Sequence, residues 1–466
     1  MMITRKTIEY TKVPEPTTPA ANEPVDLNDE TLEQHKQKIL KRMQEKQLDV
    51  IVVYADREHG VNFGYLTGFE PRFEEAALVL HKDGKAYMML GNESLRMQQY
   101  SRIKVEAVHT PYFSLPNQPM ETSKTLAGLM EDAGIKQGMK VGIAGWKLFT
   151  SSLEDNEQIY DVPYFIVTAI KEVVGEQGLL LNATSIFIHP GSGARVIMNA
   201  NEIAHYEFGA SLASDRMLRL LNKLQTGMTE MELAGELAAW GQQTNVQTIV
   251  ATGDRFTNAV VAPRAKKVSI GDKFSATLGF RGGLSSRSGY AVTSQEDLPE
   301  EVRDYLEAVA KPYYAASVAW YENIAIGLRG NEMYELIEEV IPKAEYGWKL
   351  NPGHLTAGEE WMSSPIYSGS EIPVESGMLF QMDIIPSIPG YGGASAEDGV
   401  AIADEKLRDE LAALYPDVWE RIQARRDYMI NTLGINLKPE VLPLSTINGY
   451  MRPYLLNKQY AFKVKS

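Results

Sequence analysis

The chain has 466 residues, of which 44% are hydrophobic and 23% charged, and it carries a net charge of −15. This is the composition of an ordinary globular protein of two or three domains, and the negative charge argues against nucleic-acid binding. The absence of cysteine excludes disulfides and cysteine metal sites. With no apolar run of the ~18 residues that a membrane helix needs, and no apolar signal segment at the start, we expect a cytoplasmic protein without membrane or nucleic-acid partners.

The first 190 residues alternate between helical and strand patterns. Residues 1–30 are rich in proline, threonine and asparagine, and we expect an extended N-terminal arm there. A helical repeat of apolar residues then leads into a buried strand at "DVIVVY", and strand patterns at 75–81 and 85–91 are joined by a turn at Asp83-Gly84. This alternation predicts an α/β domain over residues 31–190.

The second half begins with two helices whose starts are clearly marked. Asn199 or Asn201 can cap a long helix, and Thr229 forms a capping box with Glu232 for the next one. The later elements are expected as strands at 247–251 and 273–280, helices at 298–323 and 331–341, strands at 378–385 and 398–403, and a helix at 405–432. They predict an α+β domain over residues 191–432, followed by a C-terminal tail at 433–466.

Six segments of the second half carry a family resemblance. They are, in order, "RVIMNANEI" (195–203), "LQTGMTEMELA" (224–234), "VSIGDKFSATLGF" (268–280), "NPGHLTAG" (351–358), "SGMLFQMDIIP" (376–386) and "SAEDGVAI" (395–402). They resemble the pita-bread family of creatinase, prolidase, aminopeptidase P and methionine aminopeptidase. "VNFGYLTGFE" (61–70) and "ALVLHKDGKAYMML" (77–90) resemble the N-terminal domain of its creatinase and aminopeptidase P branch. The resemblance implies an α/β N-terminal domain and an α+β pita-bread C-terminal domain.

The metal ligands of this family are incomplete here. In its metallopeptidases two aspartates, one histidine and two glutamates hold two divalent ions. The resemblance places these positions at Thr277, at Ser288 or Arg287, and at His354, Asp383 and Glu397. A neutral hydroxyl adds little to metal binding, and a guanidinium has no lone pair to give. We therefore expect no dinuclear centre, no other cofactor, and at most one weakly bound divalent ion on His354, Asp383 and Glu397.

Creatinase works on this fold without metal, so the loss of ligands does not exclude catalysis. The resemblance places the acid–base histidine of creatinase at Val260, and the second histidine of the peptidase pattern at Trp361. The chain is therefore not a creatinase by residue identity. We expect His354 to act as the acid–base group, because its ordinary pKa of about 6.5 suits proton transfer. A structural hydrogen-bonding role for this histidine is the alternative.

Asp383 and Glu397 are expected to orient His354 or to position water. Two close carboxylates without metal repel each other, which raises one pKa. Arg287 offers them a buried counter-charge in the space of the lost ions. Alternatively, Arg287, Arg281 and Arg264 clamp a carboxylate or phosphate of the substrate, since guanidinium binds such groups bidentately.

The loop "GFEPRFEEA" (68–76) resembles one that reaches the partner's active site in creatinase-like dimers. Phe69, Arg72 and Glu74 are candidates for recognising substrate there, and a solvated loop is the alternative. Trp361 is a further candidate for lining the cleft.

The resemblance thus favours a homodimeric hydrolase that cleaves a C–N bond of a small anionic metabolite without a dinuclear metal centre. One alternative is an Xaa-Pro peptidase with a rebuilt mononuclear site. Another is a catalytically inactive binding module, as the pita-bread domain of the FACT histone chaperone is.

Overall fold

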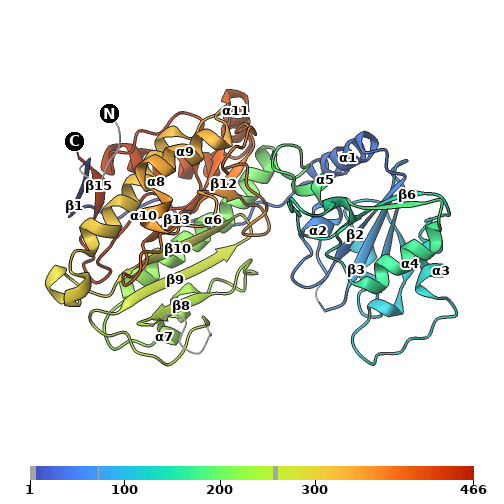
Figure 1. Ribbon diagram of the computed structural model, residues 1–466, viewed down its shortest axis with the longest axis horizontal. Helices are drawn as coiled ribbons and strands as arrows, with labels where there is room; N and C mark the ends of the chain where they lie inside the picture. Colours follow the sequence, from blue (N-terminus) through green and yellow to red (C-terminus); the bar gives the residue numbers. More distant parts are fainter. Residues whose placement is uncertain (1–6, 72, 255–260, 466) are drawn as a thin grey trace. The chain divides into compact units, whose positions relative to one another are not determined.

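The structure is a computed structural model that describes residues 7–71, 73–254 and 261–465 (Figure 1). The chain forms two compact units, Leu27–Val196 and the combination of Met1–Asp26 with Ile197–Ser466. No helix of the described residues is long and apolar enough to cross a membrane.

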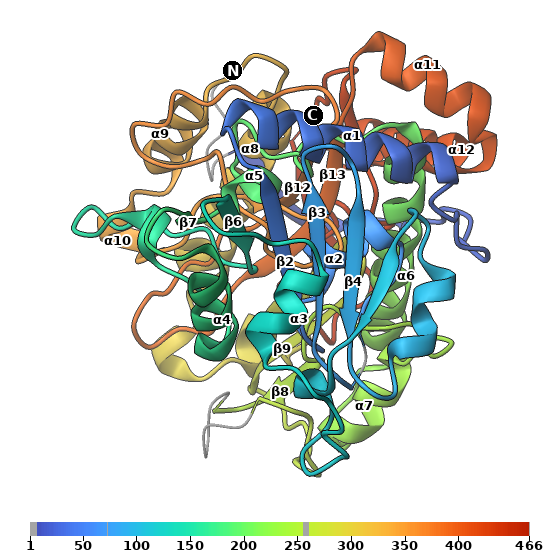
Figure 2. The same ribbon diagram turned by 90° about the vertical axis from the view of Figure 1, so that its right-hand side faces the viewer.

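The unit Leu27–Val196 is built on a six-stranded mixed sheet in the order β5-β4-β3-β2-β6-β7. Its strands are β2 (Val50–Ala55), β3 (Ala76–His81), β4 (Ala86–Leu90), β5 (Glu106–His109), β6 (Lys140–Ala144) and β7 (Leu179–Asn182). Its main helices are α1 (Asp29–Glu45), α2 (Val61–Thr67), α3 (Leu126–Asp132) and α4 (Tyr164–Val174). Apolar residues of α3 and α4 pack with those of β2, β3 and β6 (Figure 2). The predicted α/β fold and the β3–β4 turn at Gly84, where φ is +85°, are confirmed.

The second unit contains a seven-stranded sheet in the order β11-β12-β13-β10-β9-β8, with β14 paired to β13. The strands are β8 (Ile249–Thr252), β9 (Lys273–Phe280), β10 (Gly283–Tyr290), β11 (His354–Leu355), β12 (Leu379–Met382), β13 (Ser395–Ile402) and β14 (Val441–Pro443). The helices are α6 (Ala200–Lys223), α7 (Glu230–Leu237), α8 (Lys311–Asn323), α9 (Gly330–Val340), α11 (Glu405–Leu414) and α12 (Pro416–Asp427). This confirms the predicted α+β fold.

Capping and proline explain where several of these helices begin. Asn199, not Asn201, caps α6, and it does so in a capping box with Glu202. The predicted box of Thr229 and Glu232 starts α7. The single helix expected at 405–432 is instead two helices, α11 and α12. The second begins at Pro416, whose ring is tolerated in a first helical turn but breaks a helix interior.

Helix α6 packs against the β9–β10 hairpin and holds it in place (Figure 1). Gly209 makes this packing close, because a Cβ at this position would overlap the backbone carbonyl of Arg281 in the hairpin turn. The helix therefore braces the hairpin that forms the floor of the candidate site.

Both ends of the chain are built into the second unit. Strand β1 (Ile8–Lys12) pairs antiparallel with β15 (Tyr460–Val464), and β14 joins the large sheet through β13. The buried guanidinium of Arg452 forms an ion pair with Glu15 at 2.6 Å. In the described residues, the segments expected as an N-terminal arm and a C-terminal tail thus contact each other and form one clasp within the same chain.

Candidate functional site

The β9–β10 hairpin carries hydroxyls where metal-binding aspartates were considered. Its two-residue turn, Arg281-Gly282, places Thr277 directly opposite Ser286, with their hydroxyl oxygens 2.9 Å apart. The resemblance placed the second aspartate position ten or eleven residues after Thr277. In this hairpin the residue opposite Thr277 is nine residues on, and it is a serine. Ser288, two residues further along β10, also lines the cavity above the hairpin.

Arg287 points away from this floor, because neighbouring residues of a strand face opposite sides of the sheet. It is buried, and its Nη2 lies 2.5 Å from Oδ2 of Asp398. Its other hydrogen bonds go to the backbone carbonyls of Ser286, Glu397, Ile447 and Tyr450. The expectation that Arg287 neutralises the carboxylates of Asp383 and Glu397 is therefore wrong. Arg287 is the counter-ion of Asp398 and ties the C-terminal segment to β10.

The other candidate arginines do not line the cavity that the described residues enclose. Arg281 stands in the hairpin turn and donates to Gln243, while the backbone N–H of Arg264 donates to Glu230. Arg72 and Val260 lie outside the described residues. The clamp expected from several arginines is therefore not assembled among the residues that the structure describes.

Glu74 has a structural role in the unit Leu27–Val196. Its carboxylate is buried and accepts hydrogen bonds from the backbone N–H groups of Glu93, at 3.0 Å, and Ser94, at 2.7 Å. These bonds hold the turn after β4. This carboxylate is therefore committed to its own backbone. Phe69 of the same loop packs edge-on against Phe63 of α2, with ring centroids 5.6 Å apart.

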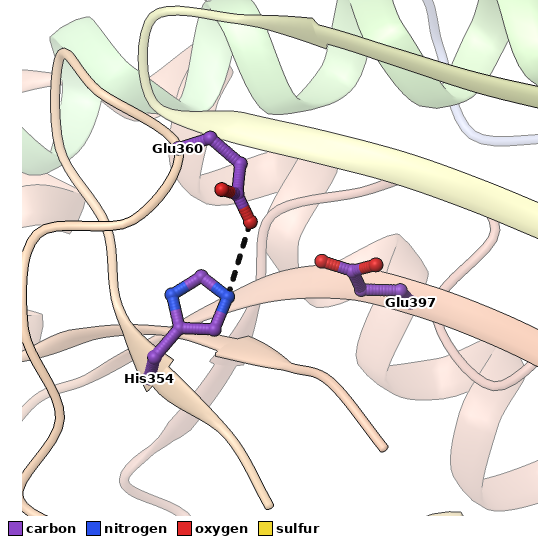
Figure 3. A group of neighbouring side chains, drawn as sticks. All are labelled: His354, Glu360 and Glu397. Atoms are coloured by element: carbon purple, nitrogen blue, oxygen red, sulfur yellow. Dashed lines mark ion pairs between the residues drawn. The ribbon is translucent and has the colours of Figure 1, made fainter. Parts of the chain in front are cut away.

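His354, Glu360, Asp383 and Glu397 form a cluster above the hairpin. His354 opens β11, Asp383 follows β12, and Glu397 lies on β13. The fully buried ring of His354 has its Nε2 3.2 Å from Glu360 Oε1 (Figure 3). The same nitrogen lies 4.0 Å from Asp383 Oδ2. Neither contact is a hydrogen bond, and Nε2 has no hydrogen-bond partner among the described residues.

The indole of Trp361 stacks on the imidazole of His354, with ring centroids 4.0 Å apart. The histidine Nδ1 lies 3.2 Å from the backbone carbonyl of Leu355. These two contacts fix the ring plane, so that Nε2 faces the carboxylates.

Burial and mutual repulsion shift the acids of the cluster. Burial raises the pKa of Asp383 to about 6, and nearby Glu360 adds to this while His354 opposes it. Burial, with Asp383 and Glu360, raises the pKa of Glu397 well above its ordinary value. Burial opposes the charged form of His354, but Glu360 and Asp383 outweigh it and raise the histidine pKa.

The cluster opens onto a cavity of about 590 Å³ within the second unit. Its floor includes Thr277 and Ser286, and Trp361 lies in its wall with 38% of its surface exposed. The acidic residues that line it are Asp254, Glu360, Asp383 and Glu397, against a single lining lysine, Lys273, among the described residues. The cavity is therefore acidic on its polar side.

The hydroxyls of Thr277 and Ser286 bond to each other and bring no negative charge to the floor of the cavity. Ligand atoms of His354, Glu360 and Glu397 do lie within 4.8 Å of one another, which is the spacing that one ion requires.

Glu360 is the member of the cluster that the sequence analysis missed. It corresponds to none of the ligand positions that the family resemblance supplies, so counting along the motifs passes over it. The usable signal was the acidic pair Glu359-Glu360, which follows His354 closely in the sequence and directly precedes Trp361. Its contact with His354 arises from the folding of the loop after β11.

Two family models match the chain. The model described as "Creatinase/Prolidase N-terminal domain" matches residues 36–166, and "Metallopeptidase family M24" matches residues 206–404. Among curated proteins, the chain is 22% identical over 356 residues to the "Uncharacterized peptidase YqhT" of Bacillus subtilis, covering 74% of this chain and 90% of that protein. It is 24% identical over 212 residues to the "Xaa-Pro dipeptidase" of Lactobacillus helveticus, and this match covers 42% of this chain and 55% of that protein.

Solved structures show the same architecture. The recombinant prolidase from Thermococcus sibiricus superimposes with a TM-score of 0.62 at 19% identity, covering 82% of this chain and 96% of that one. The prolidase from Pyrococcus horikoshii OT3 superimposes with a TM-score of 0.60 at 17% identity, covering 79% of this chain and 95% of that one.

The fold and the cluster at its centre therefore define a two-domain pita-bread protein. The chain belongs to the pita-bread family that contains the creatinases, prolidases and aminopeptidases P, within the peptidases of family M24.

Proposed function

We propose that this protein is a hydrolase of the creatinase and Xaa-Pro peptidase type that cleaves a C–N bond of a small substrate without a dinuclear metal centre. The observation that carries the proposal is the shared hydrogen bond of Thr277 and Ser286 beside an intact cluster of acids and histidine. The ligands that hold two ions are lost, while groups able to move protons are kept.

The pKa values of both buried acids are raised, and we assign them different roles from the surroundings of each. Asp383, with a pKa of about 6, is largely ionised at pH 7 and acts as the general base that takes a proton from water. Burial, with Asp383 and Glu360, raises the pKa of Glu397 well above its ordinary value, which favours its protonated form, and Glu397 acts as the acid. The water oxygen bonds to the substrate carbon, the C–N bond breaks, and Glu397 gives its proton to the leaving nitrogen.

His354 acts behind these acids. It does not line the cavity, but its Nε2 faces Glu360 and Asp383, and its raised pKa favours the imidazolium. The positive charge favours the ionised form of Asp383. After turnover the imidazolium gives its proton to Glu397, and Asp383 passes the proton that it took from water to the imidazole, which restores the starting state. His354 thus transfers protons between the two acids and orients them.

A second candidate is an Xaa-Pro peptidase with a single metal ion. The specific observation in its favour is the set of His354, Glu360 and Glu397, whose ligand atoms lie within 4.8 Å of one another. Assembly as a homodimer and a cytoplasmic location stay predictions from the resemblance and the composition.

The test is hydrolysis by the chelator-treated full chain of a panel of Xaa-Pro dipeptides, small amides and amidines, followed by amine release. We expect turnover without added metal, and its loss in Asp383→Asn and Glu397→Gln. The matched control is Glu410→Gln, an exposed acid on α11 that pairs with Lys406. Turnover that requires added Mn²⁺ would establish the second candidate instead, and no turnover across the panel with or without metal would leave a binding module.

A further inference from the structure

The cavity combines an acidic end with an apolar wall. Leu350, Trp361 and Ile385 line it with 47%, 38% and 47% of their surfaces exposed. Exposed large apolar side chains gathered at a concave site are typical of a ligand-binding wall. We infer that this cavity binds an organic cation, an ammonium group with an apolar substituent. Its role as substrate or released product rests on the proposed function.

The acidic end selects the charge of the ligand. The described lining has carboxylates from Asp254, Glu360 and Asp383, the protonated carboxyl group of Glu397, and one lysine. The three described candidate arginines lie elsewhere. A ligand carboxylate or phosphate would face like charges, which costs binding free energy in a partly desolvated site. This lining therefore argues against the anionic substrate that was expected from the sequence.

An unsatisfied acceptor marks where the ammonium nitrogen binds. Asp383 is 4% exposed, and its Oδ1 has no hydrogen-bond partner among the described residues. A buried acceptor without a donor is costly, and that cost is recovered when a ligand supplies an N–H group. Glu360 lies beside it and faces the same cavity. An ammonium group brings up to three donors and a charge of the matching sign.

The apolar wall selects the substituent. Trp361 is held by its stack on the imidazole of His354, so it presents a rigid surface to the cavity. Leu350 and Ile385 add aliphatic area to the same wall. An aromatic or branched substituent would cover these three side chains and remove apolar surface from water. A bare ammonium ion or methylamine would leave the wall exposed.

Three probes separate these contributions, measured by isothermal titration calorimetry on the chelator-treated, dialysed full chain at pH 7.5. Benzylamine has both charge and apolar ring, methylamine has the charge alone, and benzoate has the ring with the opposite charge. We expect benzylamine to bind at least tenfold more tightly than methylamine, and benzoate not to bind.

Two variants locate the site. Asp383→Asn should weaken benzylamine binding about tenfold or more, because it removes the charged acceptor. Trp361→Ala should lower the affinity for benzylamine to near that for methylamine, because it removes the aromatic ring of the apolar wall. Glu410→Gln, on α11 and outside the residues that line the cavity, should leave binding unchanged. Melting curves of each variant without ligand show that it is folded before its affinity is compared.

The inference is overturned if benzoate binds as tightly as benzylamine, if no probe binds, or if neither Asp383→Asn nor Trp361→Ala weakens benzylamine. It is also overturned if Mn²⁺ alone binds tightly and benzylamine does not, since the carboxylates then form a metal site. If benzylamine binds but no member of the substrate panel is hydrolysed, this inference stands and the proposed function is rejected. If the panel is hydrolysed but benzylamine does not bind, the proposed function stands and this inference is rejected.

Discussion

Thr277 and Ser286 face each other across the β9–β10 hairpin, with their hydroxyl oxygens in a mutual hydrogen bond of 2.9 Å. Each hydroxyl satisfies the other, so the floor of the cavity is polar but uncharged. The negative charge of the site comes instead from Glu360 and Asp383, while the carboxyl group of Glu397 lies beside Ser286 on the neighbouring strand β13. The chemistry of this family member is therefore expected to depend on protons held by buried acids.

Removing Arg287 should destabilise the protein strongly. Its partner Asp398 is fully buried, and Arg287→Ala leaves that carboxylate without a counter-charge. Breaking a buried pair costs about 3–5 kcal/mol, which urea unfolding at pH 7.5 would measure. The control is Arg329→Ala, an exposed arginine paired with Glu332, which should cost about 0–1 kcal/mol.

The loss of stability caused by Arg287→Ala should be smaller in mild acid. Burial raises the pKa of Asp398 even with Arg287 present, and the variant removes the charge that opposes this rise. The folded variant therefore takes up a proton more readily than its unfolded chain, so it regains stability as the pH falls. An equal loss of stability at pH 5.5 and 7.5 would contradict this account of the pair.

Asp383 should make the wild-type protein less stable as the pH rises. Its folded pKa of about 6 lies above the unfolded value of about 3.9. The folded state therefore binds the proton more tightly, and this contribution to stability is full below about pH 4 and lost as the pH passes 6. Asp383→Asn removes that dependence, so it should gain stability relative to wild type between pH 5 and 8 in melting curves. A constant difference across this range would show that Asp383 does not titrate as described.

The N-terminal clasp should contribute to the stability of the second unit. Glu15→Ala deprives the buried guanidinium of Arg452 of its carboxylate partner, and we expect a loss of about 2 kcal/mol in urea unfolding. The control is Glu9→Ala, which removes the looser 3.8 Å pair with Lys463 on the same two-stranded sheet. Equal effects of the two substitutions would mean that the clasp is held by its strand pairing alone.

Local patterns in the sequence predicted much of this fold. Apolar repeats and caps, such as the box of Thr229 and Glu232, are properties of neighbouring residues and were confirmed. The pairing of β1 with β15 joins residues at opposite ends of the chain, as in Ile8 and Val464, and no local pattern encodes it.

The candidate site depended on register, which is harder to predict. One residue of hairpin length decides whether a side chain faces the cavity or the opposite side of the sheet. Counting along the family pattern therefore made Arg287 a candidate for the site. In the structure, the two-residue turn places Ser286 opposite Thr277 instead. Glu360 approaches His354 through the folding of the loop after β11, and that contact has no counterpart in the spacing of the motif.

The metal content of the purified chain tests the central claim most directly. After dialysis against buffer and loading with Mn²⁺, Co²⁺ or Zn²⁺, elemental analysis should find less than one tightly held ion per wild-type chain. The double variant Thr277→Asp/Ser286→Asp introduces two facing carboxylates and should gain metal under the same conditions, which shows that the assay can detect a site here. Two tightly held ions in the wild-type chain would contradict the account.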